Sequence, residues 1–395
     1  VESEHIYRTS DSEAEAQEEE VRAAVIARGG QIVSRARLAD IAYHALLIDL
    51  PVRAIREIIE RSADSIAGLD PVMHIRPQSL ATTIEIEDAT PAGAPEDVGE
   101  LREPILALLD GVPVAAHPLL ARHLVVDDQF ELEPNAPVDQ RVHGTAMASL
   151  IVHGDRNNPA PALPRKVHMI PVMGAGDRFP PRRLVVDIIY LAVRAMREGD
   201  DATAPGVLIV NLSLGNERRP FQFALSAWAR LLDRLAYRYG ILFLVSAGNV
   251  KEAFGIPAFA TGIAFEDADG GARCDGTLTA IGNVMADRRL FSPSETINGV
   301  TVGASNDDWV SAADRRGART IIDPFPEMRA ANPSSALGPG FARSVKPDIL
   351  MPGGREHLRQ VRTDGHVFVR PAASTRPTGL KVAAPRIGGI EAAEA

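Results

Sequence analysis

Five short, largely apolar runs constrain the fold of this 395-residue chain more than any other feature. Most end in small or polar residues, and segments with helical periodicity separate several of them. Runs that are apolar on both faces are typical of strands buried in a parallel sheet that helices cover on both sides. The sequence therefore predicts an α/β fold. The runs are 104–112, 167–172, 207–214, 241–246 and 299–304.

Residues suited to a site follow three of these runs. Asp110 ends the first, and the segments 213–215 and 246–249 end two later ones. Because the carboxyl ends of parallel strands share one edge of a sheet, where ligands and catalytic groups collect, we expect these residues to meet. Taken alone, Asn249 also fits a turn after glycine, and 213–215 also fits an ordinary strand end.

The segment 142–149 places a histidine before glycine, threonine and a run of small residues. Gly144 and Ala146 leave room for another backbone to approach closely. We expect a helix over 146–150, packed through a nearly smooth face, with His143 at its start pointing into a cleft. A packed histidine without a chemical role is the alternative for His143 considered by itself.

Together, and in this order, these segments resemble the subtilisin-like serine proteases, or subtilases. The aspartate strand, the His-Gly-Thr helix start, the Asn-Leu-Ser-Leu-Gly strand and the Ser-Ala-Gly-Asn loop follow the order of that family. The segments 301–304 and 346–353 resemble two later landmarks, so that the resemblance covers roughly residues 100–385. It implies a subtilisin-like parallel sheet flanked by helices.

The resemblance also implies a role for each candidate residue. Asp110 would orient His143, which would act as general base and then general acid. Asn249 would donate an N–H to the oxyanion. The implied activity is serine endopeptidase cleavage of a peptide or protein substrate through an acyl-enzyme. The residues that would line the substrate channel are Ser213, Leu214, Gly215, Ser246, Ala247 and Gly248.

The family's nucleophile motif, a Gly-Thr-Ser that opens a buried helix, does not occur in this sequence. Gly144-Thr145 belongs to the histidine segment, and Gly276-Thr277 precedes leucine. Ser374 has the nearest spacing, but it lacks the preceding glycine and threonine, and Pro377 would interrupt a following helix.

We therefore expect the motif to lie in the parent protein beyond this chain, which alone would be inactive. A missing C-terminal segment or a partner chain would then cover the sheet. A pseudoprotease that retains the peptide channel but lacks the nucleophile is the alternative. An unrelated, non-proteolytic α/β module whose motifs match by chance is a third hypothesis.

Residues 1–80 are predicted to form a small α+β unit. A helix ending at Gly29-Gly30, two strands, a helix that begins at Pro51 and a final strand over 65–75 suggest a split βαβ arrangement. The unit resembles the propeptide-like domain that precedes many subtilase domains; an unrelated docking module is the alternative. Residues 81–102 are acidic and rich in proline and glycine, which indicates a linker. Residues 103–395 would then be the catalytic domain without its serine-bearing part.

Composition excludes several classes of function. The net charge of −10 argues against a nucleic-acid partner, since such proteins neutralise phosphates. No apolar stretch reaches the length of a membrane span, so no membrane interaction is predicted. The single cysteine, Cys274, permits no intrachain disulfide and is compatible with a reducing compartment, so we expect a cytoplasmic location.

No cofactor is required by the predicted chemistry. Structural calcium is common in the resembling family, but no ligand set can be assigned in this sequence. Asp127, Asp128 and Asp139 fit a solvated acidic loop better than a cation site, and we predict no metal-ligating residue.

Overall fold

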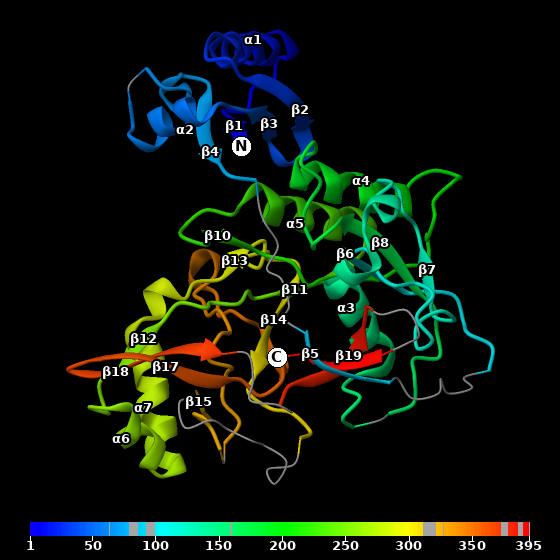
Figure 1. Cartoon of the computed structure of the whole chain (residues 1–395). Helices are drawn as coiled ribbons and strands as arrows, with labels where there is room; N and C mark the ends of the chain where they lie inside the picture. Colours follow the sequence, from blue (N-terminus) through cyan, green and yellow to red (C-terminus); the bar gives the residue numbers. More distant parts are fainter. Residues whose placement is uncertain are drawn as a thin grey trace.

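A seven-stranded sheet organises the larger part of the molecule. The computed structural model describes residues 1–62, 64–78, 86–91, 99–158, 160–310, 321–326, 328–372, 378–385 and 390–394. The strand order is β16-β14-β11-β9-β6-β8-β7, and neighbouring strands run parallel. Figure 1 shows this sheet with helices around it. The α/β class predicted from the apolar runs is confirmed. The strands are β6 (Leu106–Gly111), β7 (Leu124–Val126), β8 (Val167–Met173), β9 (Ile209–Leu212), β11 (Leu242–Ser246), β14 (Val300–Ser305) and β16 (Ile349–Pro352).

The sheet separates two apolar cores, which explains why its strands lack polar alternation. Leu109 of β6 packs in one core with helices α4 (Val185–Arg197) and α5 (Ala227–Tyr239). The neighbouring residue Leu108 packs in the other core with helix α3 (Val142–His153). Both leucines are fully buried, and burial of each contributes about 1.5–3 kcal/mol to the hydrophobic free energy of folding.

A smaller four-stranded sheet, whose strands alternate in the chain with the last strands of the main sheet, was not predicted. Its order is β12-β18-β17-β15, and helices α6 (Gly262–Asp267) and α7 (Gly270–Asn283) contribute to its core. Helix α7 begins with two glycines and carries few apolar residues, so its sequence shows little helical periodicity. Asp269 caps it by accepting the Ala272 N–H at 2.9 Å. The strands are β12 (Phe254–Ile256), β15 (Ile321–Ile322), β17 (His357–Asp364) and β18 (His366–Ala372).

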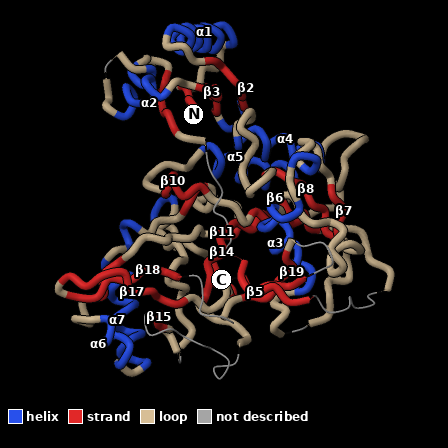
Figure 2. Tube along the Cα trace, in the orientation of Figure 1, coloured by secondary structure: helices blue, strands red, loops and turns tan. Residues whose placement is uncertain are grey.

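The N-terminal unit, residues 1–78, has β-α-β-β-α-β order and a four-stranded antiparallel sheet ordered β2-β3-β1-β4. This is the split βαβ topology that the sequence suggested. Strand β1 was missed, and β4 begins at Val72 rather than Ser65, because residues 66–68 form a 3-10 turn. The elements are β1 (Glu2–His5), α1 (Asp11–Ala27), β2 (Gln31–Leu38), β3 (Tyr43–Asp49), α2 (Val52–Ile59) and β4 (Val72–Arg76). Figure 2 shows the unit as a separate lobe.

Three further boundaries differ from the sequence-based prediction. Helix α5 begins at Ala227, not at Pro220, because β10 (Asn216–Pro220) pairs with β13 (Phe291–Ser292) and Ser226 caps the helix. Helix α4 begins at Val185, after the prolines at 180 and 181. Within the predicted linker, β5 (Ile86–Pro91) is a strand that pairs with β20 (Ile390–Glu394), which itself pairs with β19 (Leu380–Ala384).

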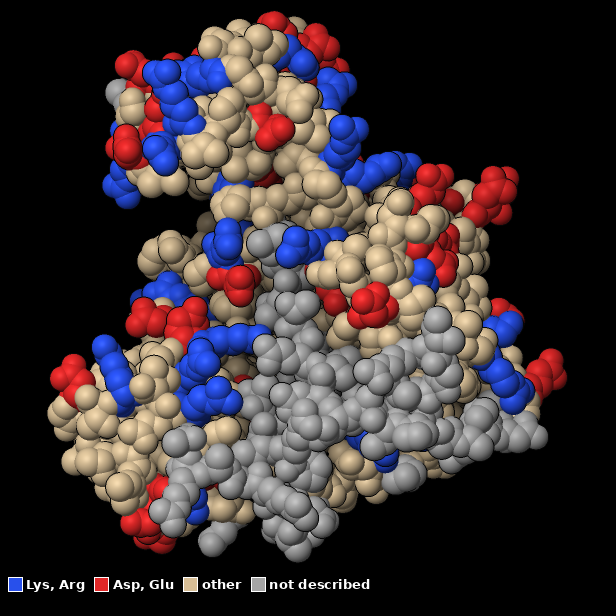
Figure 3. Space-filling view, in the orientation of Figure 1, with Lys and Arg blue, Asp and Glu red and all other residues tan. Residues whose placement is uncertain are grey.

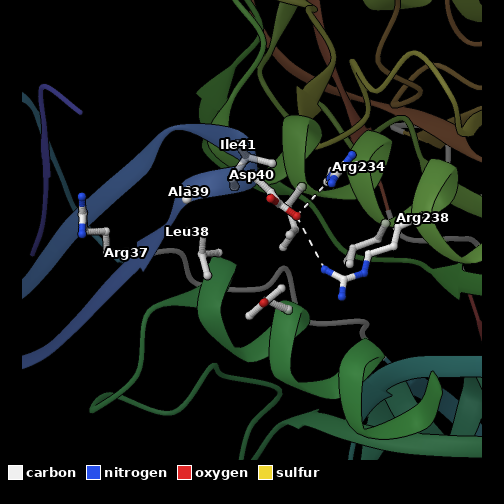
Figure 4. Close-up of a pocket in the computed structure, with 10 residues that line it drawn as sticks. Arg37, Leu38, Ala39, Asp40, Ile41, Arg234 and Arg238 are labelled. Carbon is white, nitrogen blue, oxygen red and sulfur yellow. Dashed lines mark hydrogen bonds and ion pairs between the residues drawn. The ribbon is translucent and has the colours of Figure 1, made fainter. Parts of the chain in front are cut away.

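The N-terminal unit packs on α4 and α5. Tyr43 and Leu47 of β3 are buried in the same core as these helices. The connection between β2 and β3 adds polar contacts, since Asp40 lies 3.1 Å from Arg234 and 3.6 Å from Arg238. Figure 4 shows these contacts in a pocket of about 200 Å³, none of whose lining residues belongs to the candidate site described below.

A buried carboxylate joins the N-terminal unit to the larger part of the chain. Glu4 is 2% exposed and lies 2.5 Å from Arg76, 3.5 Å from Arg230 and 3.9 Å from Arg219. Burial alone would raise the pKa of Glu4, but the hydrogen bond from Arg76 and the charges of the three arginines outweigh it and lower that pKa. Charges elsewhere on this unit are mixed over its surface, as Figure 3 shows.

The Glu4→Gln substitution is therefore expected to lower the free energy of unfolding by about 1.5–3 kcal/mol, because three partly exposed guanidinium groups lose the charged partner that they share. Denaturant unfolding at neutral pH measures the change. Glu19→Gln is the matched control: Glu19 is exposed and lies 3.5 Å from Arg22, three positions along the same helix, so its loss should change stability by less than about 1 kcal/mol. Equal, small effects of the two substitutions would contradict the assigned role of Glu4.

Candidate active site

The carboxyl ends of β6, β9 and β11 lie next to one another at one edge of the main sheet. Strand β9 pairs with both neighbours, with Leu108 opposite Asn211 and Leu212 opposite Val245. Because adjacent strands are about 4.8 Å apart, the ends of these three strands lie within about 10 Å. The topology thus brings Asp110 and the two predicted channel segments, 213–215 and 246–248, to one edge (Figure 1).

Asp110 and His143 meet in a buried pair although they are 33 positions apart in the chain. The Asp110 carboxylate oxygen Oδ1 lies 2.5 Å from Nδ1 of the imidazole. Asp110 is fully buried, and His143 is 7% exposed. Since a carboxylate only accepts, this contact requires Nδ1 to carry the proton, which leaves Nε2 of the neutral ring as the basic nitrogen. The arrangement suits an imidazole that accepts and returns a proton.

The start of α3 approaches the end of β6 so closely that a side chain could not fit between them. A Cβ added at Gly144 would lie 2.0 Å from the carbonyl oxygen of Gly111. Thr145 strengthens the junction, since its hydroxyl accepts the Val114 N–H at 2.9 Å and donates to the Arg141 carbonyl. Glycine at 144 is thus a requirement for placing His143 beside Asp110. The helix is longer than predicted and includes His143 itself.

A second buried carboxylate, Asp177, supports the histidine from its backbone. Its Oδ2 accepts the His143 N–H at 3.2 Å, and the residue is 1% exposed. This contact caps α3, whose N-cap residue makes no side-chain cap of its own. A Cβ at Gly111 would lie 2.4 Å from Asp177 Oδ1, so glycine there makes room for the carboxylate. Asp177 was not predicted as a site residue, although it follows the apolar run of β8 much as Asp110 follows that of β6.

The environment of Asp177 makes it an unusually weak acid. Burial and, to a smaller extent, the charge of Asp110 raise the pKa of Asp177, whereas the charge of His143 and the hydrogen bond from its backbone N–H lower it; the net pKa is about 6. Asp177 and Asp110 thus place two carboxylates beside one imidazole, and each carries one oxygen without a hydrogen-bond partner within the described part of the chain.

The predicted oxyanion and channel residues lie at the same edge of the main sheet, after β9 and β11. Asn249 is exposed, and its backbone bridges Ser335, while Gly248 O accepts the Ala336 N–H at 2.9 Å. In the other segment Leu214 is buried, and Ser213 Oγ donates to Asn211 at 2.9 Å. The two segments therefore come from neighbouring strand ends, as predicted, but Leu214 faces the core. Their roles toward a substrate stay predictions.

The remaining candidates have structural surroundings. His117, in the segment between β6 and β7, is buried, and its Nδ1 accepts the Leu119 N–H at 3.2 Å, which stabilises this loop. Asp128 accepts the N–H groups of Leu132 and Glu133, which fixes an acidic turn. In the described ranges no three or more His, Cys, Asp or Glu side chains are arranged to hold a metal ion. Nor does any described helix have the length and apolarity to cross a membrane. Ser374 lies outside the described residues.

The pKa of Asp177 predicts a pH dependence of stability. A pKa raised from 3.8 to about 6 means that the folded protein keeps a proton that the unfolded chain has already released. The stability that Asp177 contributes in its protonated form is fully present below pH 3.8 and is lost as the pH rises through about 6. The free energy of unfolding falls by up to about 3 kcal/mol over this range. Asp177→Asn keeps an acceptor for His143 N–H but has no proton to release.

We therefore expect Asp177→Asn to be more stable than the wild type at pH 8, and the difference to shrink below pH 5. Denaturant unfolding across pH 4–8 measures it. Asp139→Asn, at an exposed position, controls for the loss of one negative charge. A stability difference between Asp177→Asn and the wild type that does not vary with pH would contradict this account of Asp177.

Comparison with known proteins agrees with the geometry. The model of the subtilase family matches residues 102–384. An uncharacterized protein of Sinorhizobium fredii, y4bN, is 28% identical over 152 residues, which cover 38% of this chain and 31% of that protein. The chain thus matches about a third of the length of this curated relative.

Proteases are also among the solved structures that a structural comparison finds similar to this chain. The prenylagaramide maturation protease PagA is 15% identical, with a TM-score of 0.34 over 68% of this chain and 69% of its own. The psychrophilic subtilisin-like protease Apa1 from the Antarctic Pseudoalteromonas sp. AS-11 is 15% identical, with a TM-score of 0.37 over 66% of this chain and 43% of its own.

Proposed function

The chain belongs to the subtilase family, and from this premise we propose that its protein is a serine endopeptidase that cleaves peptide bonds through an acyl-enzyme. The observation that carries the proposal is the buried contact of 2.5 Å between Asp110 and His143 Nδ1. It fixes the tautomer in which Nε2 can take a proton from a hydroxyl nucleophile. Residues 102–384 are a subtilase-family protease domain.

In the proposed mechanism, each group at the sheet edge has one task. His143 Nε2 removes the proton of a serine hydroxyl as the oxygen attacks the peptide carbonyl. The buried Asp110 carboxylate stabilises the imidazolium that forms, because a negative charge lies beside it in a site shielded from water. His143 then returns the proton to the leaving amine, and the same sequence of steps with water releases the acid.

Asn249 is proposed to hold the oxyanion of the tetrahedral intermediate. Two features support this role: the residue follows β11, two strands from Asp110, and it is exposed where a substrate could reach it. Its backbone is fixed on both sides, since Val250 N donates to Ser334 O at 2.7 Å and Gly248 O is bonded as well. A donor held in place before the reaction needs no reorganisation when charge develops.

The nucleophile is proposed to be a serine hydroxyl within reach of His143 Nε2. This sequence contains no Gly-Thr-Ser motif, and Ser374 is the candidate with the nearest spacing in it. Residues 1–80 are proposed to act as a propeptide-like domain. Their packing on α4 and α5 through Tyr43 and Leu47 supports an intramolecular role, and a docking module for another protein is the alternative.

Labelling by a fluorophosphonate tests the triad in the complete protein as its gene encodes it. The wild type should label, and His143→Ala should lower the labelling rate by at least about 10³-fold, because no base remains for the hydroxyl. His74→Ala, which removes an exposed histidine of the N-terminal unit, should label like the wild type. Ser374→Ala tests whether Ser374 is the nucleophile. A folded protein that neither labels nor cleaves any peptide would instead indicate a pseudoprotease.

The role of Asn249 gives a separate kinetic prediction. Asn249→Ala should lower kcat by about 10²–10³-fold with little change in KM, as for the loss of one oxyanion donor whose contact forms only in the transition state. The control is Asn283→Ala, at an exposed position near the end of α7. If KM rose while kcat stayed constant, Asn249 would be a binding residue and the oxyanion assignment would be wrong.

A further inference from the structure

The side chain of Phe291 lies against both predicted channel segments, with its ring facing Gly248 and its Cβ facing Gly215. A Cβ added at Gly248 would lie 2.5 Å from Phe291 Cδ2 and 2.9 Å from its Cβ, and a Cβ at Gly215 would lie 3.3 Å from Phe291 Cβ. Phe291 is only 7% exposed. The two glycines therefore face a large side chain that the protein itself supplies, and not an open slot.

Several contacts hold this ring in place. Phe291 N donates to the Ala247 carbonyl at 3.0 Å, and β13 pairs with β10, with Phe291 opposite Pro220. Ser294 Oγ donates to the Phe291 carbonyl at 2.6 Å. The ring packs in a buried cluster with Phe221, Ala247, Val250, Leu290 and Ala336. A backbone fixed at both ends and a packed ring cannot move aside without disrupting this cluster.

The position of this cluster defines which substrate residue it meets. Gly248 directly precedes Asn249, the proposed donor to the carbonyl under attack. A substrate residue whose carbonyl oxygen reaches Asn249 is therefore expected to place its side chain beside Gly248, near the ends of the neighbouring strands β9 and β11. A substrate side chain entering there would meet the Phe291 ring, and a buried ring resists added volume.

We propose that Phe291 closes the pocket for the residue on the amino side of the scissile bond, so that the protein takes peptides with glycine or alanine at that position. The inference rests on the proposed function, because it uses the assignment of Asn249 and of the channel segments. The contact with Phe291 adds the substrate preference to the proposed function. Without Phe291, the two glycines Gly215 and Gly248 would leave space for a large substrate side chain.

The first experiment measures kcat/KM of the complete protein on peptides that differ only in that residue: glycine, alanine, leucine or phenylalanine. The wild type should prefer glycine and alanine to phenylalanine by at least about 100-fold, the discrimination that a filled apolar pocket gives. Phe291→Gly should raise kcat/KM for the phenylalanine peptide by at least 10-fold, an estimate from the same scale of pocket discrimination. Phe291→Leu should raise kcat/KM for the phenylalanine peptide by a smaller factor. This variant replaces Phe291→Gly in the test if the glycine variant does not fold.

Phe221→Ala is the matched control. It removes a ring of similar size, 6% exposed, from the same cluster, but Phe221 is not among the nearest atoms to either glycine. It should leave the preference for small residues unchanged. A wild type that prefers phenylalanine, or a preference that Phe291→Leu leaves unaltered, would overturn the proposal.

A second experiment separates this inference from the catalytic proposal. Calorimetry compares binding of product peptides that end in alanine or phenylalanine, which requires no nucleophile. Tighter binding of the alanine peptide to the wild type, reversed in Phe291→Gly, supports the pocket even if no variant hydrolyses a peptide; in that case only the peptidase proposal fails. Absence of binding by either peptide to the folded protein, or no reversal in Phe291→Gly, overturns the pocket assignment.

Discussion

The approach of α3 to the end of β6 is the constraint on which the candidate site depends. Gly144 lies against the Gly111 carbonyl, where a Cβ would be 2.0 Å away. Only this separation allows the Asp110 carboxylate, fixed at the end of a buried strand, to reach His143 Nδ1 at 2.5 Å. The sheet fixes one partner and the helix start fixes the other. The geometry of the pair is therefore a consequence of backbone packing, and not of flexible side chains.

A second carboxylate stabilises this buried helix start. A helix start buried without a capping partner is unfavourable, and Asp177 supplies the partner for His143 N–H at 3.2 Å. Burial of Asp177 beside Asp110 raises its pKa to about 6. Glycine at 111 makes room for this carboxylate. Functional sites commonly combine such perturbed acids with close packing, and here both serve to place one imidazole.

Much of the fold and part of the site could be predicted from local patterns. Leu108 and Leu109 are buried on opposite faces of β6, and such two-sided burial produces the apolar run that indicates a parallel strand. Asp110, His143 and Asn249 could be nominated from the sequence because they stand in segments that resemble subtilase motifs. The structure brings Asp110 and His143 into contact, and the role of Asn249 stays a prediction. Element ends were less predictable, since tertiary pairing and capping set them. The helix predicted from Pro220 begins only at Ala227, because Pro220 belongs to β10, which pairs with β13, and Ser226 caps the helix.

Other features depend on contacts that no local pattern encodes. Helix α7 begins with Gly270 and Gly271 and has little apolar periodicity, so its packing beside β12 was not visible in the sequence. Asp177 can cap the helix at His143 only because the chain after β8 lies beside α3. Phe291 contacts Gly248 only because β13 brings its ring to that loop. Each of these residues acts across a long separation in sequence, which a search for contiguous motifs cannot detect.

The central claim is that Asp110 holds the imidazole of His143 through a buried Nδ1–H hydrogen bond. Solution NMR of this chain with ¹⁵N-labelled histidine tests it directly and needs no nucleophile. The account predicts a far-downfield proton resonance bonded to His143 Nδ1, which is present in the wild type and lost in Asp110→Ala. A His143 ring whose proton resides on Nε2, or whose spectrum Asp110→Ala leaves unchanged, would contradict it.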